Sequence, residues 1–193
     1  MANFIGQYQL EDLSICDALL DLFQQGHAAG LTKPGVVGQD KHQNQEVKQS
    51  TDFSLQSAQP LGPPDKFRFP EYHNEISKFI DNYCEERKIY EYCGKFEMRH
   101  APQIQWYKPG EGFYRWHIDG NHELSERAIA YITYLNDVDD GGTEFMHQGI
   151  KINAVKGRTI IFPTSLTHIH RGVVSNTQDK YIITNWLYWD NAR

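Results

Sequence analysis

The sequence predicts a mainly β protein (α+β in detail), in which a jelly-roll or antiparallel β-sandwich core carries helices on its outside. Two amphipathic helical patterns lie in the first half of the chain, and beyond Gly94 the apolar period changes to that of strands. Roughly eight short strands follow without another helical pattern. Helices followed by a run of strands favour a sheet-on-sheet core with the helices packed against it.

The first predicted helix covers Leu10–Gln25, where apolar residues recur at spacings of three and four, and Gly26 is its expected end. The second runs from Glu71 to about Arg87, directly after Pro70. Its expected buried face consists of Tyr72, Ile76, Phe79, Ile80, Tyr83 and Cys84.

The segment between the helices, Gly26–Pro70, is rich in Gly, Gln, Ser, Lys and Pro and has only short apolar pieces. Loops of this length in compact domains are either binding elements or disordered segments. We expect a binding element that covers a ligand.

The strands are predicted from alternation and from β-rich apolar runs. Ala128–Leu135 is almost continuously apolar, which is typical of a strand buried on both faces. Asn136–Gly142 has turn chemistry. Further strands are expected near Phe145 and over Ile150–Val155, Thr159–Phe162, Ile169–Val174 and Tyr181–Trp189. We expect residues 1–193 to form one domain, with helical support and a long loop in 1–95 and the β core in 96–190.

Composition and charge exclude several classes of function. The formal net charge of −6 argues against nucleic acid as the main partner, because phosphate binding needs clustered Lys and Arg. The sequence has no apolar run near the roughly 20 residues that span a bilayer. The three cysteines are widely spaced, and the N-terminus does not resemble a signal peptide. We therefore expect a soluble, cytoplasmic protein.

The chemistry centres on the segment Trp106–Asp119, which ends in His117-Ile118-Asp119. If this segment is a strand, the imidazole and the carboxylate lie on one face, since side chains two apart point the same way. They would supply two of the three ligands of the 2-His-1-carboxylate triad that binds Fe(II). The third ligand is expected from His168 or His170 on a late strand. The competing interpretation is that these histidines only form hydrogen bonds in a polar core.

Several motifs occur in an order that resembles the 2-oxoglutarate- and Fe(II)-dependent dioxygenases, and in particular their prolyl-4-hydroxylase-like branch. The motifs are WHID, RAIAYITYLNDV, GGTEF, AVKGRTIIFP, HRGVV and KYIITNWL, and the resemblance covers about residues 96–190. It implies a double-stranded β-helix and an oxidoreductase that uses Fe(II), 2-oxoglutarate and O2. The resemblance leaves open whether ascorbate is needed.

The resemblance also assigns the metal ligands. The His-x-Asp pair of the family falls on His117 and Asp119. Its distal histidine, in a His-x-Gly context, falls on His170 and leaves His168 as a neighbour.

The same resemblance implies cosubstrate-binding residues. The family's lysine, ten residues after the distal histidine, falls on Lys180, which would pair with the far carboxylate of 2-oxoglutarate. Tyr107, in a Tyr-x-x-Gly context, would donate to the same carboxylate, and Tyr114 is a further candidate to face cosubstrate or substrate. One departure concerns Thr143, because the preceding glycine pair runs into it without the extra residue that the family often has.

By analogy, the leading substrate is a peptidyl proline that becomes hydroxylated. The enzymatic alternative is a free amino acid or another small molecule, and repair of nucleic acid is disfavoured by the charge. The non-enzymatic alternative is a metal-free jelly roll that binds a sugar or protein. Iron retention and succinate formation separate the enzyme from the binding module. The sequence predicts no oligomeric state.

Overall fold

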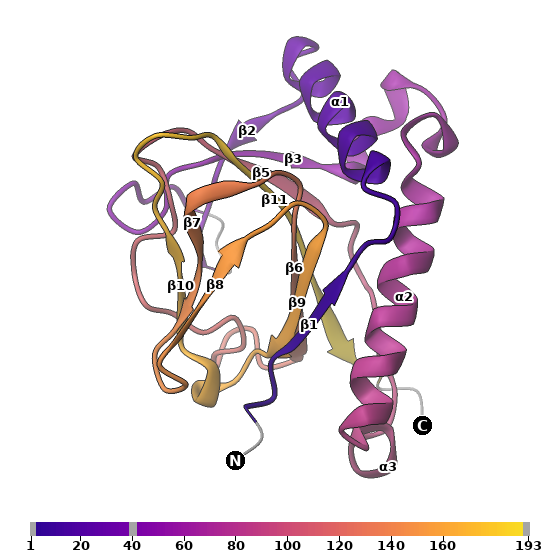
Figure 1. Ribbon diagram of the computed structural model, residues 1–193, viewed down its shortest axis with the longest axis vertical. Coiled ribbons are helices and arrows are strands. Elements are labelled where there is room, and N and C mark those ends of the chain that lie inside the picture. The colour runs from indigo at the N-terminus through magenta and orange to yellow at the C-terminus, as the bar shows by residue number, and fades with distance from the viewer. Residues whose placement is uncertain (1–2, 39–41, 191–193) are drawn as a thin grey trace.

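The computed structural model describes residues 3–38 and 42–190, and these form two antiparallel sheets that face each other (Figure 1). The main sheet has the order β1-β9-β6-β11-β5-β3-β2, with β4 also paired to β11, and the second sheet has the order β10-β7-β8. The main-sheet strands are β1 (Gly6–Gln9), β2 (Lys33–Pro34), β3 (Thr51–Ser54), β4 (Phe96–Glu97), β5 (Gln103–Tyr107), β6 (Arg127–Tyr134), β9 (Arg158–Pro163) and β11 (Lys180–Trp189). The second-sheet strands are β7 (Val138–Phe145), β8 (Ile150–Ala154) and β10 (His170–Val173). The predicted mainly β class with a jelly-roll core is confirmed.

Strand β6 shows why the main sheet needs apolar residues on both faces. Ile129 and Tyr131 belong to the core beneath the helices, whereas Ala130, Ile132 and Tyr134 belong to the core between the sheets. Because alternate side chains of a strand point to opposite faces, one continuous apolar run serves both cores.

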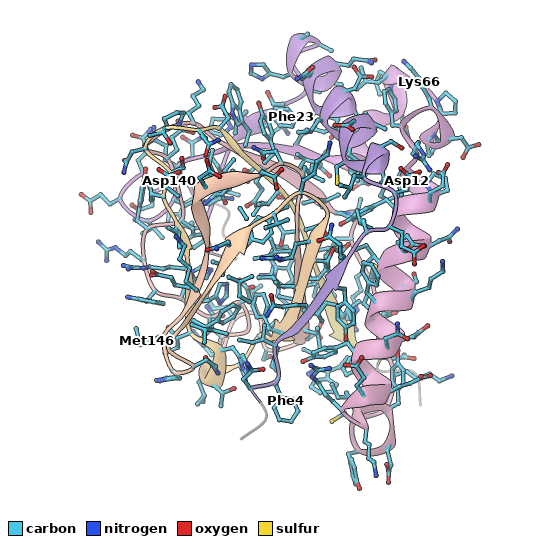
Figure 2. The ribbon with its side chains drawn as sticks, viewed as in Figure 1. Phe4, Asp12, Phe23, Lys66, Asp140 and Met146 are labelled. Atoms are coloured by element: carbon cyan, nitrogen blue, oxygen red, sulfur yellow. The ribbon has the colours of Figure 1, made fainter. Side chains whose placement is uncertain are left out.

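The helices α1 (Ser14–Ala28) and α2 (Phe69–Glu86) cover the outer face of the main sheet (Figure 1). Helix α1 continues past its predicted end, so Gly26 lies inside it. A Cβ at Gly26 would come within 2.7 Å of the Phe53 ring, which explains the glycine by close packing. Phe23 of α1, which is labelled in Figure 2, meets the Phe53 ring edge-on, with the ring centroids 6.3 Å apart. The predicted second helix and its buried face are confirmed by α2.

The segment Gly26–Pro70 is more ordered than a long loop. It contains β2, β3 and the 3₁₀ helices η1 (Leu55–Leu61) and η2 (Pro64–Phe67), while residues 39–41 lie outside the described part. Strand β3 pairs with β5 and buries Phe53 completely. This segment therefore extends the main sheet.

Two local predictions are wrong. The segment Trp106–Asp119 is not one strand, because β5 ends at Tyr107 and the remainder is a loop held by single bridges between Lys48 and Phe113 and between His117 and His170. Asn136–Gly142 is not a simple turn either. Strand β7 begins at Val138, and its pairing with β8 shifts register before Gly142, so the glycine pair lies within an irregular strand.

A short α3 (Ile89–Cys93) joins α2 to the sheet region. Among the described residues, the helices are too short or too polar to cross a bilayer.

Candidate active site

Three potential metal ligands meet between the two sheets. The Nε2 atoms of His117 and His170 each lie 3.7 Å from a carboxylate oxygen of Asp119. One ligand atom from each residue lies within 4.8 Å of the others. Two imidazole nitrogens and one carboxylate form the facial triad that binds Fe(II) and leaves its other coordination positions open.

The backbone brings these three side chains together without the predicted strand. His117 and His170 face each other in an antiparallel bridge, in which each backbone N–H donates to the other's carbonyl at 2.9 Å. Residues directly opposite in such a bridge present their side chains on one face. Asp119 follows two residues after His117, in the loop that leads to β6.

Both histidines have the tautomer that a metal requires. The Nδ1–H of His117 donates to the Arg115 carbonyl at 3.1 Å, and that of His170 donates to the His168 carbonyl at 3.0 Å. These bonds leave both Nε2 lone pairs directed at the cluster. Burial, together with the neighbouring His170, lowers the pKa of His117 to about 4, so its imidazole is neutral at pH 7.

Asp119 supplies the negative charge of the cluster. Burial alone would raise its pKa, but the adjacent His170 and His117, with the Trp186 N–H and Arg127, outweigh burial and hold the pKa below its usual value. Two imidazole nitrogens and one carboxylate therefore fit a divalent cation.

His168 is not part of this cluster. It lies in the 3₁₀ helix η3 (Leu166–His168), and its Nε2 lies 2.9 Å from the Asn3 carbonyl. Its Nδ1 lies 2.9 Å from the Thr167 hydroxyl. The structure therefore places His170, and not His168, beside His117 and Asp119.

Lys180 and Tyr107 lie in the same cavity as the cluster. They are directly opposite each other on β11 and β5, and the Lys180 Nζ lies 5.0 Å from the centre of the Tyr107 ring. The ammonium donates to the Val173 carbonyl at 2.6 Å. Burial lowers the pKa of Lys180 to about 8. A buried cation beside a phenol suits a carboxylate ligand.

Tyr114 lies elsewhere, contrary to the expectation that it faces cosubstrate or substrate. Its hydroxyl donates to the Gly110 carbonyl at 3.0 Å, with the Gln49 Oε1 3.3 Å away as the alternative acceptor, and it does not line the cavity. Thr143 does line the cavity, where its hydroxyl lies 2.7 Å from that of Tyr134.

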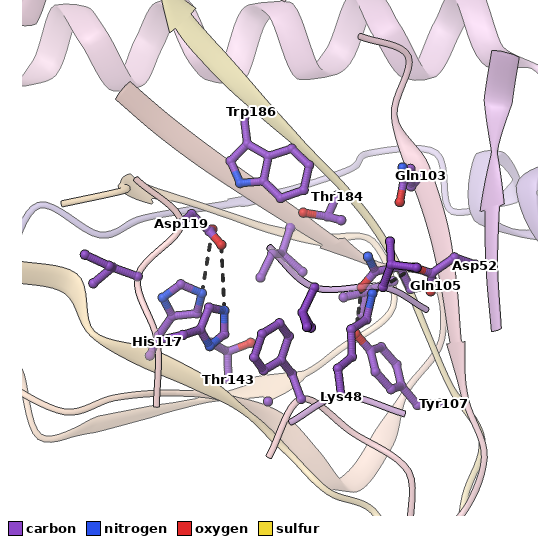
Figure 3. A pocket seen from close by; sticks show the side chains of 18 of the residues that line it. Lys48, Asp52, Gln103, Gln105, Tyr107, His117, Asp119, Thr143, Thr184 and Trp186 are labelled. Atoms are coloured by element: carbon purple, nitrogen blue, oxygen red, sulfur yellow. Dashed lines mark hydrogen bonds and ion pairs between the residues drawn. The ribbon is translucent and has the colours of Figure 1, made fainter. Parts of the chain in front are cut away.

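The cavity has a volume of about 320 Å³, and part of its wall comes from the N-terminal segment. Lys48 and Asp52 form an ion pair of 2.7 Å, with only 4% and 12% of their side chains exposed. Figure 3 shows this pair, with Gln105 and Tyr107, on the side of the cavity away from His117 and Asp119. Sequence reasoning missed the pair, because no local pattern connects it to the distant metal ligands.

Next to Asp119 the cavity contains the buried Arg127 Nε, which makes no hydrogen bond with the described residues. The guanidinium of Arg127 lies 3.8 Å from the centre of the Trp186 ring, and the Trp186 N–H lies close enough to Asp119 to lower the pKa of its carboxyl. A buried donor is normally satisfied, so the Arg127 Nε indicates a site that is completed by a ligand or by water.

Comparison with known proteins supports this interpretation of the cavity. Residues 102–188 match the family model described as the 2OG-Fe(II) oxygenase superfamily. The match includes the three potential metal ligands, Lys180 and Tyr107. A search of curated proteins found no match.

Solved structures of prolyl hydroxylases share the fold. A Pseudomonas putida prolyl-4-hydroxylase is 14% identical, with a TM-score of 0.69 over 97% of this chain and 94% of that one. A prolyl hydroxylase from Trichoplax adhaerens, solved with a hypoxia inducible factor peptide fragment, is 16% identical, with a TM-score of 0.74 over 97% and 84%. The viral collagen prolyl hydroxylase of Paramecium Bursaria Chlorella virus-1, solved with 2OG, is 19% identical, with a TM-score of 0.67 over 95% of both.

The matched region thus contains the potential Fe(II) ligands in a jelly roll shared with prolyl hydroxylases. Residues 102–188 are therefore similar to the 2OG-Fe(II) oxygenase superfamily, and the fold that carries them is shared with prolyl hydroxylases.

Proposed function

We propose that this chain is a 2-oxoglutarate- and Fe(II)-dependent dioxygenase that hydroxylates a substrate C–H bond, with Fe(II) held by His117, Asp119 and His170. The observation that carries the proposal is the convergence of these three side chains in one cavity with Lys180. Three protein ligands on a six-coordinate ion leave positions for 2-oxoglutarate and O2. The bound iron would couple oxidation of 2-oxoglutarate to succinate and CO2 with insertion of oxygen into the C–H bond.

Lys180 and Tyr107 are proposed to bind the distal carboxylate of 2-oxoglutarate. An unpaired carboxylate in a buried cavity is costly, so it needs a cation. Lys180 is 3% exposed and its ammonium lies over the Tyr107 ring, so a carboxylate bound there would meet a cation beside a phenolic donor. In this arrangement the protein orients the cosubstrate while its other end reaches the metal.

The proposed substrate is a prolyl residue in a peptide, in keeping with the prolyl hydroxylases that share the fold. A free amino acid or another small molecule is the second candidate. It is favoured by the buried Lys48–Asp52 pair, which offers opposite charges to the carboxylate and ammonium of a zwitterion. We further propose that residues 1–193 act as one domain, because the N-terminal segment completes the cavity wall.

The test is anaerobic reconstitution with Fe(II) and 2-oxoglutarate, followed by O2-dependent turnover against proline-containing peptides and free amino acids, with mass detection. The expected result is succinate formation coupled to a mass gain of one oxygen atom on one substrate class. The Asp119→Ala variant is the control and should produce neither. Iron retention without substrate-dependent succinate formation would contradict the proposal.

A further inference from the structure

The hydroxyl of Tyr107 already has a partner inside the cavity. It donates to the Oε1 of Gln105 at 2.6 Å. Both residues point to the same face of β5, two positions apart, and they are 4% and 7% exposed. The bond is therefore short and shielded from water.

A phenol has one O–H and can donate strongly to only one acceptor at a time. Burial, with the charges of Asp52 and Asp119, raises the pKa of Tyr107 well above its usual value, so the phenol keeps this proton. Lys180 does not compete for it, because its ammonium is itself a donor and is bonded to the Val173 carbonyl. In the structure the Tyr107 hydroxyl proton is therefore donated to the Gln105 side chain.

We propose that Gln105 competes with the distal carboxylate of 2-oxoglutarate for the single hydroxyl proton of Tyr107, and thereby limits cosubstrate affinity. The proposal rests on the assignment of Tyr107 and Lys180 to 2-oxoglutarate given above. When the cosubstrate binds, the O–H turns from the amide to the carboxylate. The Gln105 carbonyl then loses its donor in a buried place, and this loss offsets part of the gain at the carboxylate.

Gln105 is thus a positioning residue, and it acts on the cosubstrate only through Tyr107. Removing its carbonyl should free the phenol in advance and tighten binding. Gln103 provides a matched control, because it is the same residue type on the same face of β5 and lines the same cavity. No hydrogen bond joins Gln103 to Tyr107 within the described structure.

The experiment is a double-mutant cycle on 2-oxoglutarate affinity, measured by calorimetry with the anaerobic Fe(II) protein. Gln105→Leu should lower the Kd by roughly threefold to tenfold, the value of one neutral hydrogen bond. In a Tyr107→Phe background the same change should have no effect, and Gln103→Leu should leave the Kd unchanged. Gln105→Met, which keeps the side-chain length, provides the measurement if the leucine variant does not fold.

Two outcomes overturn the proposal, and they differ in meaning. The first outcome is that the wild-type protein binds 2-oxoglutarate but Gln105→Leu and Gln105→Met bind it equally or more weakly. Gln105 then does not compete with 2-oxoglutarate for the Tyr107 proton, and the proposal is wrong. A tightening that persists in the Tyr107→Phe background likewise shows that Gln105 does not act through Tyr107. If the wild-type Fe(II) protein does not bind 2-oxoglutarate, the proposed function fails, and this inference fails with it.

Discussion

Lys180 has a pKa of about 8 because it is buried, and this makes cosubstrate binding sensitive to pH. The ammonium binds a carboxylate only when it is protonated, and its protonated fraction falls as pH rises through 8. We therefore expect 2-oxoglutarate affinity to be constant below about pH 7 and to fall by up to about tenfold per pH unit above 8. Titrations of the anaerobic Fe(II) protein at several pH values measure this.

The matched control for that profile is Lys180→Arg, because a guanidinium stays charged throughout the range. Its affinity should be lower than that of the wild type, since its shape differs, but it should not fall above pH 8. A parallel fall in both proteins would assign the titration to another group.

Removing the Lys180 charge should cost more than removing the phenol. Lys180→Ala should weaken 2-oxoglutarate binding by about 3 kcal/mol or more, the upper end for a charge-assisted bond. Tyr107→Phe should cost only about 0.5 kcal/mol, because its proton must first leave Gln105. The metal-to-ligand charge-transfer band follows both titrations, and iron binding should survive in both variants. Wild-type affinity in Lys180→Ala would contradict the assignment.

Substitution of His168 and of His170 should have different effects on iron retention and turnover. His170→Ala should abolish turnover and iron retention on anaerobic dialysis, because it removes a ligand of the proposed triad. His168→Ala should keep iron and some activity, and should lose about 1 kcal/mol of stability with its hydrogen bond to the Asn3 carbonyl. Loss of iron from His168→Ala but not from His170→Ala would mean that the wrong histidine is assigned.

At the scale of elements, the contact between α1 and β3 depends on Gly26. Alanine normally stabilises a helix interior relative to glycine by up to about 1 kcal/mol. Here the added Cβ would meet the Phe53 ring, which is fully buried and cannot move freely. We expect Gly26→Ala to lower the free energy of unfolding by about 1–3 kcal/mol, as overpacking does.

Denaturant unfolding measures the effect of Gly26→Ala, with the exposed Gln24→Ala on the same helix as control. The control should be neutral or slightly stabilising. A Gly26→Ala protein more stable than wild type would show that the Phe53 ring has room to shift.

The sequence predicted elements well where the signal is local. Helix α2 and strand β6 follow directly from their apolar periods. Prediction from the sequence failed for strands whose pairing partner is distant in the sequence. Strand β3 contains one buried aromatic, Phe53, in a polar stretch, and it is a strand because β5 pairs with it.

The same distinction holds for the site. Motif spacing predicts His117, Asp119, His170, Lys180 and Tyr107 as site residues, and the structure places all five around one cavity, although the strand assumed for the first two does not exist. The wall residues Lys48, Asp52 and Gln105 belong to no motif. Only the sheet order brings β3 and β5 to the cavity that also contains the metal ligands, so no local pattern could have found these wall residues.

At the scale of the molecule, the three potential ligands come from a loop and a strand that are far apart in sequence, so metal binding should stabilise the whole domain. At a metal concentration a hundred times Kd, the gain is about 2.7 kcal/mol. For a chain of this size, that corresponds to a rise in Tm of roughly 5–11 °C. Mn(II) can replace Fe(II) in aerobic thermal unfolding. Asp119→Ala should show no rise, and an equal rise in both proteins would place the metal elsewhere.

The cavity is lined by two stretches of chain that have different proposed roles. Residues 107–186 carry the proposed iron and cosubstrate contacts, whereas the wall that contains Lys48 and Asp52 precedes the family match. Substitutions in this wall can therefore change the substrate preference during evolution, while the residues proposed to bind iron and 2-oxoglutarate stay the same. Exchanging residues 33–54 between relatives would use this separation in protein engineering. The chimera should have the substrate preference of the relative that supplied these residues.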